Sequence, residues 1–211
     1  RRLNITRREF ISNASHELRT PIAAIKSSAE TLQMGAISDK NFSKKFLKLI
    51  FNDAQRLEDL VTELMELTRL ESGDIELNLI KISPFHIIKN SFDRFFQICS
   101  NKKIELHLDS KSENVNSLVN VDTDKFDQVL ANMINNAIKW TDENGEIVLS
   151  CIEKEKSIEF KIRDNGSGIP QESLPHIFER FFKIDSSRSE PGTGLGLSIS
   201  NHIIDLHGGK I

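Results

Sequence analysis

Apolar residues recur at every third or fourth position through two long stretches of the first third of the chain, and this periodicity constrains the fold more than any other feature. The first series comprises Phe10, Ala14, Leu18, Ile22, Ile25, Ala29 and Leu32. The second comprises Phe46, Ile50, Leu57, Leu60, Leu64 and Leu67. Such spacing places apolar side chains on one face of a helix. We therefore predict one helix that ends near Gly35 and another that has the polar segment "SDKNFS" at its start and ends at Gly73.

Two helices of this size are each about 45 to 50 Å long, at about 1.5 Å per residue. A lone helical hairpin of that length leaves most of its apolar stripes in contact with water. Pairing with a second copy of the chain covers the stripes, which predicts an all-α antiparallel hairpin and a homodimeric four-helix bundle for residues 1–72. The alternative is that the hairpin packs onto the rest of the same chain.

The pattern changes near Asp74 to a mixture of helix and strand, which predicts a separate α+β domain over residues 73–211. The segments "SPFHIIKNSFDRFFQICSN" and "FDQVLANMINNAIKW" have helical patterns, and "KKIELHLDS" alternates like a strand. "GEIVLSCIEKEKSIEFKIRDNG" has the pattern of a β-hairpin around "EKEKS", and a short helix is expected around "LPHIFERFF". The chain stops at "HGGKI" as a strand begins, so we expect this domain to lack its last strands.

Composition excludes several classes of function. The chain has 31 acidic and 28 basic residues and a net charge of -3, so direct contact with nucleic acid is not expected. Cys99 and Cys151 form no C-x-x-C pair, which is typical of buried thiols in a reducing compartment. No apolar run reaches the ~20 residues that span a bilayer, and the start "RRLNITRREF" lacks the apolar core of a signal peptide. We therefore expect a soluble, cytoplasmic piece.

Two glycine-rich stretches, "DNGSGIP" and "GTGLGLSISNHI", are typical of nucleotide-binding loops. Glycine permits close approach of the backbone, and the second stretch runs directly into a helix whose N-terminal amides can face phosphates. Leu197 stands where G-x-G-x-x-G requires its third glycine, and no G-x-x-x-x-G-K-[ST] is present. Neither a Rossmann nor a P-loop site is supported, and each loop taken alone is more often a structural turn.

A third stretch, "LANMINNAIKW", favours the nucleotide interpretation. Asn132 and Asn136 are one helical turn apart and share a face, and Lys139 lies three residues further on. Neutral amide oxygens suit a Mg²⁺ ion whose charge is already offset by phosphates. The three stretches together indicate a site for a nucleotide and its metal ion.

At these residues the chain resembles the sensor histidine kinases of two-component signalling, over essentially its whole length. In order, "NASHELRTP" resembles the phosphoacceptor box of that family, "NMINNAIKW" its asparagine box, "DNGSGIP" its first glycine box, "FERFFKID" its phenylalanine box and "GTGLGL" its second glycine box. The resemblance implies a dimeric helical hairpin joined to an α/β sandwich of the gyrase, chaperone and histidine-kinase type, which binds Mg-ATP under a mobile lid. The N-terminal segment is also similar to phosphate-regulon and cell-wall-regulating sensor kinases.

The resemblance makes His16 the phosphoacceptor. Glu17 beside it can accept a hydrogen bond from Nδ1-H, which leaves Nε2 as the nucleophile. Pro21 cannot donate to the carbonyl of Glu17, so the helix can bend one turn after His16. Thr20 lies on the same face, at the position where the family orients water against a phosphorylated regulator. A lone histidine without this motif would more often be a solvated or core-edge side chain.

In the nucleotide site, the resemblance implies that Asp164 accepts from the adenine amino group, that Asn136 is the main Mg²⁺ ligand and that Lys183 contacts phosphate. Trp140 replaces the tyrosine that is common in this box. Its ring either stacks on the nucleotide or is buried in the core, and both alternatives are left open. Arg188 in the lid can meet phosphate or be solvated. The positions implied to bind nucleotide are Asn132, Asn136, Lys139, Trp140, Asp164, Gly166, Gly168, Ile169, Lys183, Gly192, Thr193, Gly194, Leu195 and Gly196. Phe178, Phe181 and Phe182 are expected to anchor the lid by packing.

The expected function is therefore ATP-dependent autophosphorylation of His16 in a homodimer and phosphotransfer to an aspartate of a response-regulator receiver domain. Phosphatase activity towards the phosphorylated regulator is also expected. Residues 72–74 would act as a hinge, and attachment to a membrane would require an upstream segment outside this chain. Two rivals are an ATPase clamp of the gyrase or chaperone kind and a non-catalytic docking module. Asn132 stands where the clamp enzymes carry a glutamate base, and intact His16, Asn136 and Asp164 disfavour the second rival.

Overall fold

The structure is a computed structural model that describes residues 2–35, 38–73, 75–184 and 192–211. The chain forms two compact units. The first contains residues 1–72 and 179–195, and the second contains residues 73–178 and 196–211. The break between residues 72 and 73 coincides with the expected domain boundary, whereas residues 179–195 group with the helical hairpin. The assignment of functional domains to residues 1–72 and 73–211 remains a prediction.

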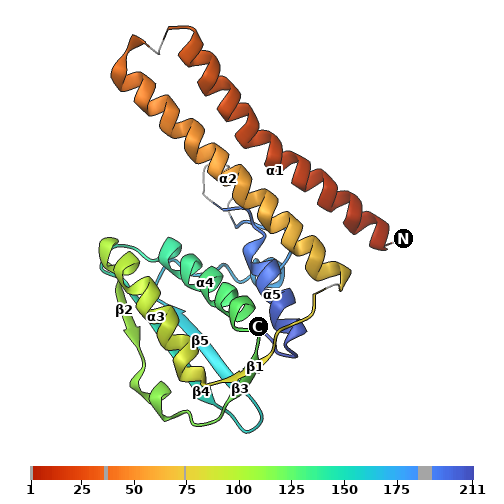
Figure 1. Cartoon of the computed structure of the whole chain (residues 1–211), viewed down its shortest axis with the longest axis vertical. Helices are drawn as coiled ribbons and strands as arrows, with labels where there is room; N and C mark the ends of the chain where they lie inside the picture. The colour runs from red at the N-terminus through yellow and green to blue at the C-terminus, as the bar shows by residue number, and fades with distance from the viewer. Residues whose placement is uncertain (1, 36–37, 74, 185–191) are drawn as a thin grey trace. The chain divides into compact units, whose positions relative to one another are not determined.

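The first unit is built on two antiparallel helices, α1 (Arg2–Gln33) and α2 (Lys40–Ser72) (Figure 1). Gly35 has a positive φ of 119°, just after the end of α1. The Asp39 carboxylate accepts from the backbone N–H groups of Asn41 at 2.8 Å and Phe42 at 3.2 Å, which caps the start of α2. Gly73, with a φ of 74°, follows the end of α2 in the left-handed region. The helix ends predicted from the sequence are confirmed.

The hairpin buries few side chains for its length. Leu60, Leu67 and Leu70 of α2 are buried, as is Leu32 near the end of α1. Pro21 is fully buried inside α1, and the helix continues past it. The proline therefore does not end the helix. The bend after His16 that the sequence predicts stays a prediction.

The second unit contains two small sheets. In one, β1 (Ile80–Ile82) pairs antiparallel with β3 (Val119–Val121). In the other, β4 (Glu146–Glu153) is central: it pairs parallel with β2 (Glu105–Leu108) and antiparallel with β5 (Ile158–Asp164). The β4–β5 hairpin predicted around "EKEKS" is confirmed, and β5 ends at Asp164.

The second unit also contains the α-helices α3 (Pro84–Asn101), α4 (Thr123–Trp140) and α5 (Gly196–Leu206), and a short 3₁₀ helix, η2 (Ser110–Asn114). Helix α3 contacts β2 and β4, α4 contacts β5 and α3, and α5 contacts α4 (Figure 1). The core between them contains fully buried aliphatic side chains, namely Ile88, Ile134, Ile147, Leu149, Ile199 and Ile203. This packing fixes α4, the end of β5 and the start of α5 relative to one another.

The short helix expected around "LPHIFERFF" is not formed. The segment has a 3₁₀ turn, η3 (Leu174–His176), and then further turns. Phe181 has a φ of 64°, and its N–H donates to the carbonyl of Gly194 at 2.9 Å. A residue in that conformation with that partner cannot continue an α-helix, so a long-range bond replaces the local one. Within the described ranges, no helix combines the length and apolar character that crossing a membrane requires.

Candidate active site

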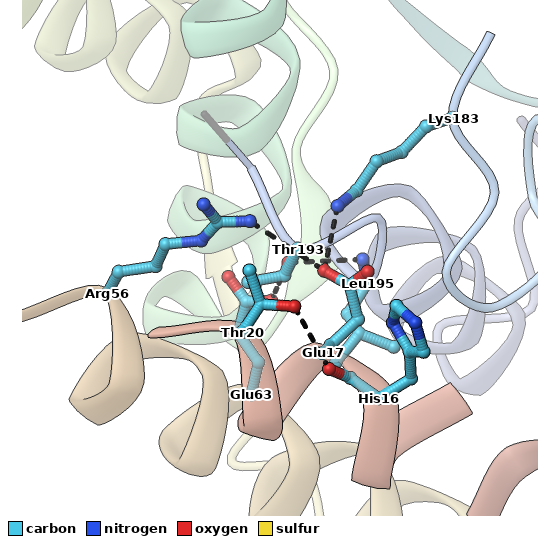
Figure 2. Close-up of polar contacts among 8 residues, drawn as sticks. All are labelled: His16, Glu17, Thr20, Arg56, Glu63, Lys183, Thr193 and Leu195. Carbon is cyan, nitrogen blue, oxygen red and sulfur yellow. Dashed lines mark hydrogen bonds and ion pairs between the residues drawn. The ribbon is translucent and has the colours of Figure 1, made fainter. Parts of the chain in front are cut away.

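His16 lies on α1 with its side chain exposed, as a residue that meets a substrate must be (Figure 2). Thr20, one turn further on, is also exposed, and its hydroxyl donates to the backbone carbonyl of His16 at 3.3 Å. That bond uses the hydroxyl proton within the helix and leaves the oxygen as an acceptor. The two side chains share one accessible stretch of α1.

The Glu17 carboxylate is half-buried and faces two cations (Figure 2). Its Oε2 accepts from Lys183 Nζ at 2.8 Å and lies 3.7 Å from Arg56 Nη2. Among the described residues no hydrogen bond joins Glu17 to His16. The expected pairing is therefore absent from this arrangement, in which Lys183, predicted to contact phosphate, contacts the neighbour of the phosphoacceptor instead.

Glu63 of α2 lies outside every motif recognised in the sequence. Its carboxylate is hydrogen-bonded to the hydroxyl of Thr193, which also accepts from the N–H of Leu195 at 3.2 Å (Figure 2). Burial raises the pKa of Glu63; the bond from Thr193 lowers it, and the nearby charges of Asp59 and Glu66 raise it further. The only feature of the sequence that distinguishes Glu63 is its place between two other acids, Asp59 and Glu66, on the same face of α2.

Residues 180–195 include a close approach between the phenylalanine box and the second glycine box. Gly194 has a φ of 77°, and a Cβ there would lie 2.7 Å from the backbone carbon of Phe181. Only glycine fits this contact. The Phe181 ring packs against Phe10 of α1, with ring centroids 5.9 Å apart, in keeping with an anchoring role. Gly192 is described, with a φ of 131°, whereas Arg188 and the rest of residues 185–191 lie outside the described residues.

In helix α4 of the second unit, Asn132 and Asn136 have different surroundings. Asn132 donates through Nδ2 to the carbonyl of Gly196 at 3.2 Å and to the hydroxyl of Ser200 at 3.3 Å. This side chain ties α4 to the start of α5 and keeps its Oδ1 as an acceptor. Asn136 is half-buried, and within the described residues its amide makes no hydrogen bond. A partly desolvated amide with an available oxygen suits a cation ligand.

The end of α4 presents an aromatic ring beside a cation. Lys139 Nζ lies 4.4 Å from the centre of the Trp140 ring. The Trp140 side chain is 39% exposed, so it is not part of the buried core. Of the two alternatives left open by the sequence, stacking against a ligand is the one that an exposed ring permits.

The first glycine box forms a tight turn after β5. Asp164 accepts through Oδ1 from the N–H of Gly166 at 3.0 Å and is exposed. A Cβ on Gly166 would lie 2.2 Å from the carbonyl oxygen of Trp140, so the turn passes directly over the end of α4. The next N–H, of Ser167, donates to that carbonyl at 3.2 Å. Asp164, Gly166 and the asparagine helix are thus held together by backbone contacts.

The remaining predicted positions differ in accessibility. Gly168 has a φ of 73°, which favours glycine, and Ile169 is 46% exposed beside it. Leu195 is fully buried, so its side chain belongs to the packing, and Gly196 begins α5 with its carbonyl bonded to Asn132. Phe178, Phe181 and Phe182 are all half-buried, as expected for packing residues.

Comparisons with known proteins match both parts of the chain. Residues 6–73 match the family model "His Kinase A (phospho-acceptor) domain". Residues 121–211 match the model "Histidine kinase-, DNA gyrase B-, and HSP90-like ATPase". The first match contains His16, and the second contains Asn132, Asn136 and both glycine boxes.

Among curated proteins, the sensor histidine kinase WalK of Bacillus subtilis (strain 168) is 34% identical over 209 residues, which cover 97% of this chain and 34% of WalK. The chain spans about a third of the length of the curated relatives it matches. Among solved structures, the histidine kinase ThkA in complex with the response regulator protein TrrA gives a TM-score of 0.78 at 27% identity, covering 96% of this chain and 56% of that one. The Acinetobacter baumannii histidine kinase AdeS gives 0.67 at 28% identity, covering 90% and 86%.

Proposed function

The chain belongs to the sensor histidine kinases, and from that premise we propose that it transfers the γ-phosphoryl group of ATP to His16 and then to an aspartate of a response-regulator receiver domain. One observation carries the proposal: an exposed histidine stands on a phosphoacceptor helix in a chain that also carries the matching ATPase domain. Nε2 of the neutral imidazole attacks the γ-phosphorus, the bond from phosphorus to the bridging oxygen breaks, and ADP leaves.

Glu17 has to change partners for this reaction. It accepts from Lys183 and faces Arg56 in the described arrangement. When Lys183 moves to the phosphate oxygens, the carboxylate is free to accept from Nδ1-H of His16. That bond fixes the tautomer in which Nε2 carries the lone pair, and it stabilises the positive charge that develops on the ring.

Asn136 fits a Mg²⁺ ion because its half-buried amide makes no hydrogen bond within the described residues. Asn132 can add its free Oδ1, and Lys139 lies near enough along α4 to meet phosphate. The ion offsets the charge of the phosphates when it is bound. Asp164 accepts a hydrogen bond from the adenine amino group, and the exposed Trp140 ring packs against the nucleotide.

The hairpin functions as a homodimer. An open groove of about 430 Å³ runs between α1 and α2 and is lined mainly by apolar side chains, including Ile11, Leu18, Leu64 and Met65. Ile11 and Met65 are each 56% exposed. Covering such a face with the same face of a second hairpin gives a four-helix bundle, in which both copies bury identical surfaces.

The partner in phosphotransfer is a response-regulator receiver domain, as the complex of ThkA with TrrA suggests by analogy. Thr20 serves the reverse reaction, because its oxygen lies one turn from His16 on the same exposed stretch and can orient water towards the phosphorylated aspartate. These steps take place in the cytoplasm. Cys99 and Cys151 are buried free thiols, and burial raises the pKa of each, as suits a reducing compartment.

Incubation with γ-labelled Mg-ATP tests the function. The parent should acquire acid-labile, alkali-stable phosphate, and His16→Gln should lose it while still binding ADP. His86→Gln replaces another exposed histidine, on α3, and should be labelled like the parent. Equal labelling of His16→Gln would reject the acceptor, and release of phosphate without labelled protein would favour an ATPase clamp.

A further inference from the structure

We infer that Asn165 is a positioning residue that holds the Asp164 carboxylate in the orientation that selects adenine. The inference rests on the proposed function, in which Asp164 accepts from the 6-amino group of the base. Asn165 belongs to the glycine-box turn, but neither its residue type nor its spacing from the glycines reveals what its side chain does. The structure supplies that information through contacts within the second unit.

Asn165 extends the β4–β5 pairing by one position with its side chain. The regular ladder ends where Ile147 faces Asp164. At the next position the N–H of Asn165 donates to the carbonyl of Glu146 at 3.3 Å, and its Oδ1 accepts from the N–H of Glu146 at 2.8 Å. In an antiparallel ladder a backbone carbonyl would accept that second bond. The side-chain oxygen therefore takes the place of a carbonyl, so the backbone is free to leave the strand and enter the turn.

The neighbouring residue leaves room for this substitute bond. A Cβ on Gly145 would lie 2.9 Å from Asn165 Oδ1 and 2.3 Å from the Thr141 methyl group. Any larger residue at position 145 would press on the Asn165 side chain. The glycine at position 145 thus allows the Asn165 side chain to lie against the start of β4. A rotamer that pointed to solvent would lose the hydrogen bond to Glu146.

The turn is consequently anchored on both sides of Asp164. Asn165 fixes one side to β4, and Ser167 fixes the other to the Trp140 carbonyl at 3.2 Å. Between these anchors, Asp164 Oδ1 accepts from the N–H of Gly166 at 3.0 Å. With Oδ1 committed inside the turn, Oδ2 is the oxygen left to accept from a ligand, and its direction is set by the turn.

Orientation is important here because Asp164 is exposed. An exposed carboxylate without these constraints samples several rotamers, and ordering it on binding weakens affinity. A fixed acceptor also discriminates more sharply, since a site built to bond a polar group penalises a ligand that lacks it. Loss of the Asn165 anchor should therefore reduce recognition of the amino group more than binding of the sugar and phosphates.

The test compares ADP with purine riboside 5′-diphosphate, which lacks the 6-amino group, by calorimetry with Mg²⁺ on the whole chain. Diphosphates avoid turnover. The parent should bind ADP at least about tenfold more tightly, as expected for a hydrogen bond to a charged group. Asn165→Ala should reduce that ratio to below about threefold, chiefly by weakening ADP binding. Asn165→Asp keeps an acceptor for the Glu146 N–H and should retain most of the ratio, and Asn90→Ala, at an exposed position on α3, should retain all of it.

Each other outcome has a distinct meaning. A parent that binds both nucleotides equally would overturn the proposed adenine recognition, and the inference with it. A parent that discriminates, together with an Asn165→Ala variant that discriminates equally, would overturn the inference alone. Equal weakening of both nucleotides would show a purely structural role and would also overturn it. If Asn165→Ala melts at a much lower temperature than the parent, the comparison is repeated with Asn165→Ser. The shorter serine side chain also loses the bond to the Glu146 N–H, but it keeps a polar group at position 165.

Discussion

The two units differ in how they use apolar side chains. The second unit buries Ile134, Ile147 and Leu149 completely between its helices and its sheet. The helical hairpin leaves Ile22 52% exposed and Phe51 68% exposed, and its groove is open. The second unit thus has a completely buried core of its own, whereas the hairpin buries few apolar side chains, and we expect a partner surface to cover its groove. We therefore expect nucleotide binding to need only the second unit of one chain, and the helical hairpin to need a second copy.

The largest expected effect concerns the self-contained core. Ile134→Ala removes a fully buried side chain from α4 and should lower the free energy of unfolding of the second unit by about 2 to 5 kcal/mol. Urea unfolding followed by circular dichroism measures the change. Ile98→Ala, on the exposed side of α3, is the matched control and should cost less than about 1 kcal/mol. A loss that varied with protein concentration would contradict the self-contained character of this unit.

The second prediction addresses the hairpin. Replacing both Ile11 and Met65 by lysine places charges on the groove and should raise the dimer dissociation constant by about thirtyfold or more, equivalent to about 2 kcal/mol. Sedimentation equilibrium measures this constant. Lys161→Glu, at an exposed position on β5, should leave it unchanged. A parent that stays monomeric at high micromolar concentration with its helices folded would exclude the bundle.

A smaller effect separates two activities on one helix. Thr20→Ala should retain substantial autophosphorylation and lose about tenfold or more of its phosphatase activity, because His16 is untouched while the oxygen that orients water is gone. Dephosphorylation of the regulator in ADP and labelling by ATP are measured on the same preparation. Unchanged dephosphorylation would reject the role of Thr20, and equal loss of both activities would indicate a damaged helix.

The smallest effect is a pH dependence in the first unit. Burial raises the pKa of folded Glu63 above its unfolded value, so protonation favours the folded state. The contribution is complete below the unfolded pKa of about 4.3 and is lost as pH rises through the raised folded pKa. Glu63→Gln, which stays neutral, should therefore be slightly more stable relative to the parent at pH 7 than at pH 4. Thermal melting at both values measures the difference, and the reverse order would contradict the burial of this carboxylate.

Local signals predicted much of this fold. Glycines at positions 35 and 73 and the polar cap before α2 fixed the helix ends, because capping depends on neighbours in the sequence. The motifs assigned α4 and the first glycine box to one nucleotide site, which stays a prediction. In the structure, the turn at Gly166 approaches the Trp140 carbonyl at the end of α4.

Long-range partners could not be predicted in the same way. Glu63 meets Thr193, 130 positions further along the chain, and Arg56 meets Glu17 of the other helix. The periodicity of α2 contains no information about either partner. Nor could it show that Glu17 would contact Lys183, or that Phe181 would bond to Gly194 and stop the expected helix. The contacts of Lys183, Thr193 and Phe181 depend on how residues 181–183 and 193–194 pack within the first unit, which is decided by the tertiary structure.

The exposed ring at the end of α4 also gives the protein a built-in optical reporter. Trp140 is the sole tryptophan of the chain, which has no tyrosine, so almost all of the intrinsic fluorescence originates from this indole. An ammonium group lies 4.4 Å from its centre, and the glycine-box turn rests on its carbonyl. A ligand that displaces Lys139 or stacks on the ring should change the wavelength or the quantum yield of the tryptophan emission. If nucleotide binds as proposed, its occupancy should be measurable in real time from this fluorescence on the unlabelled chain.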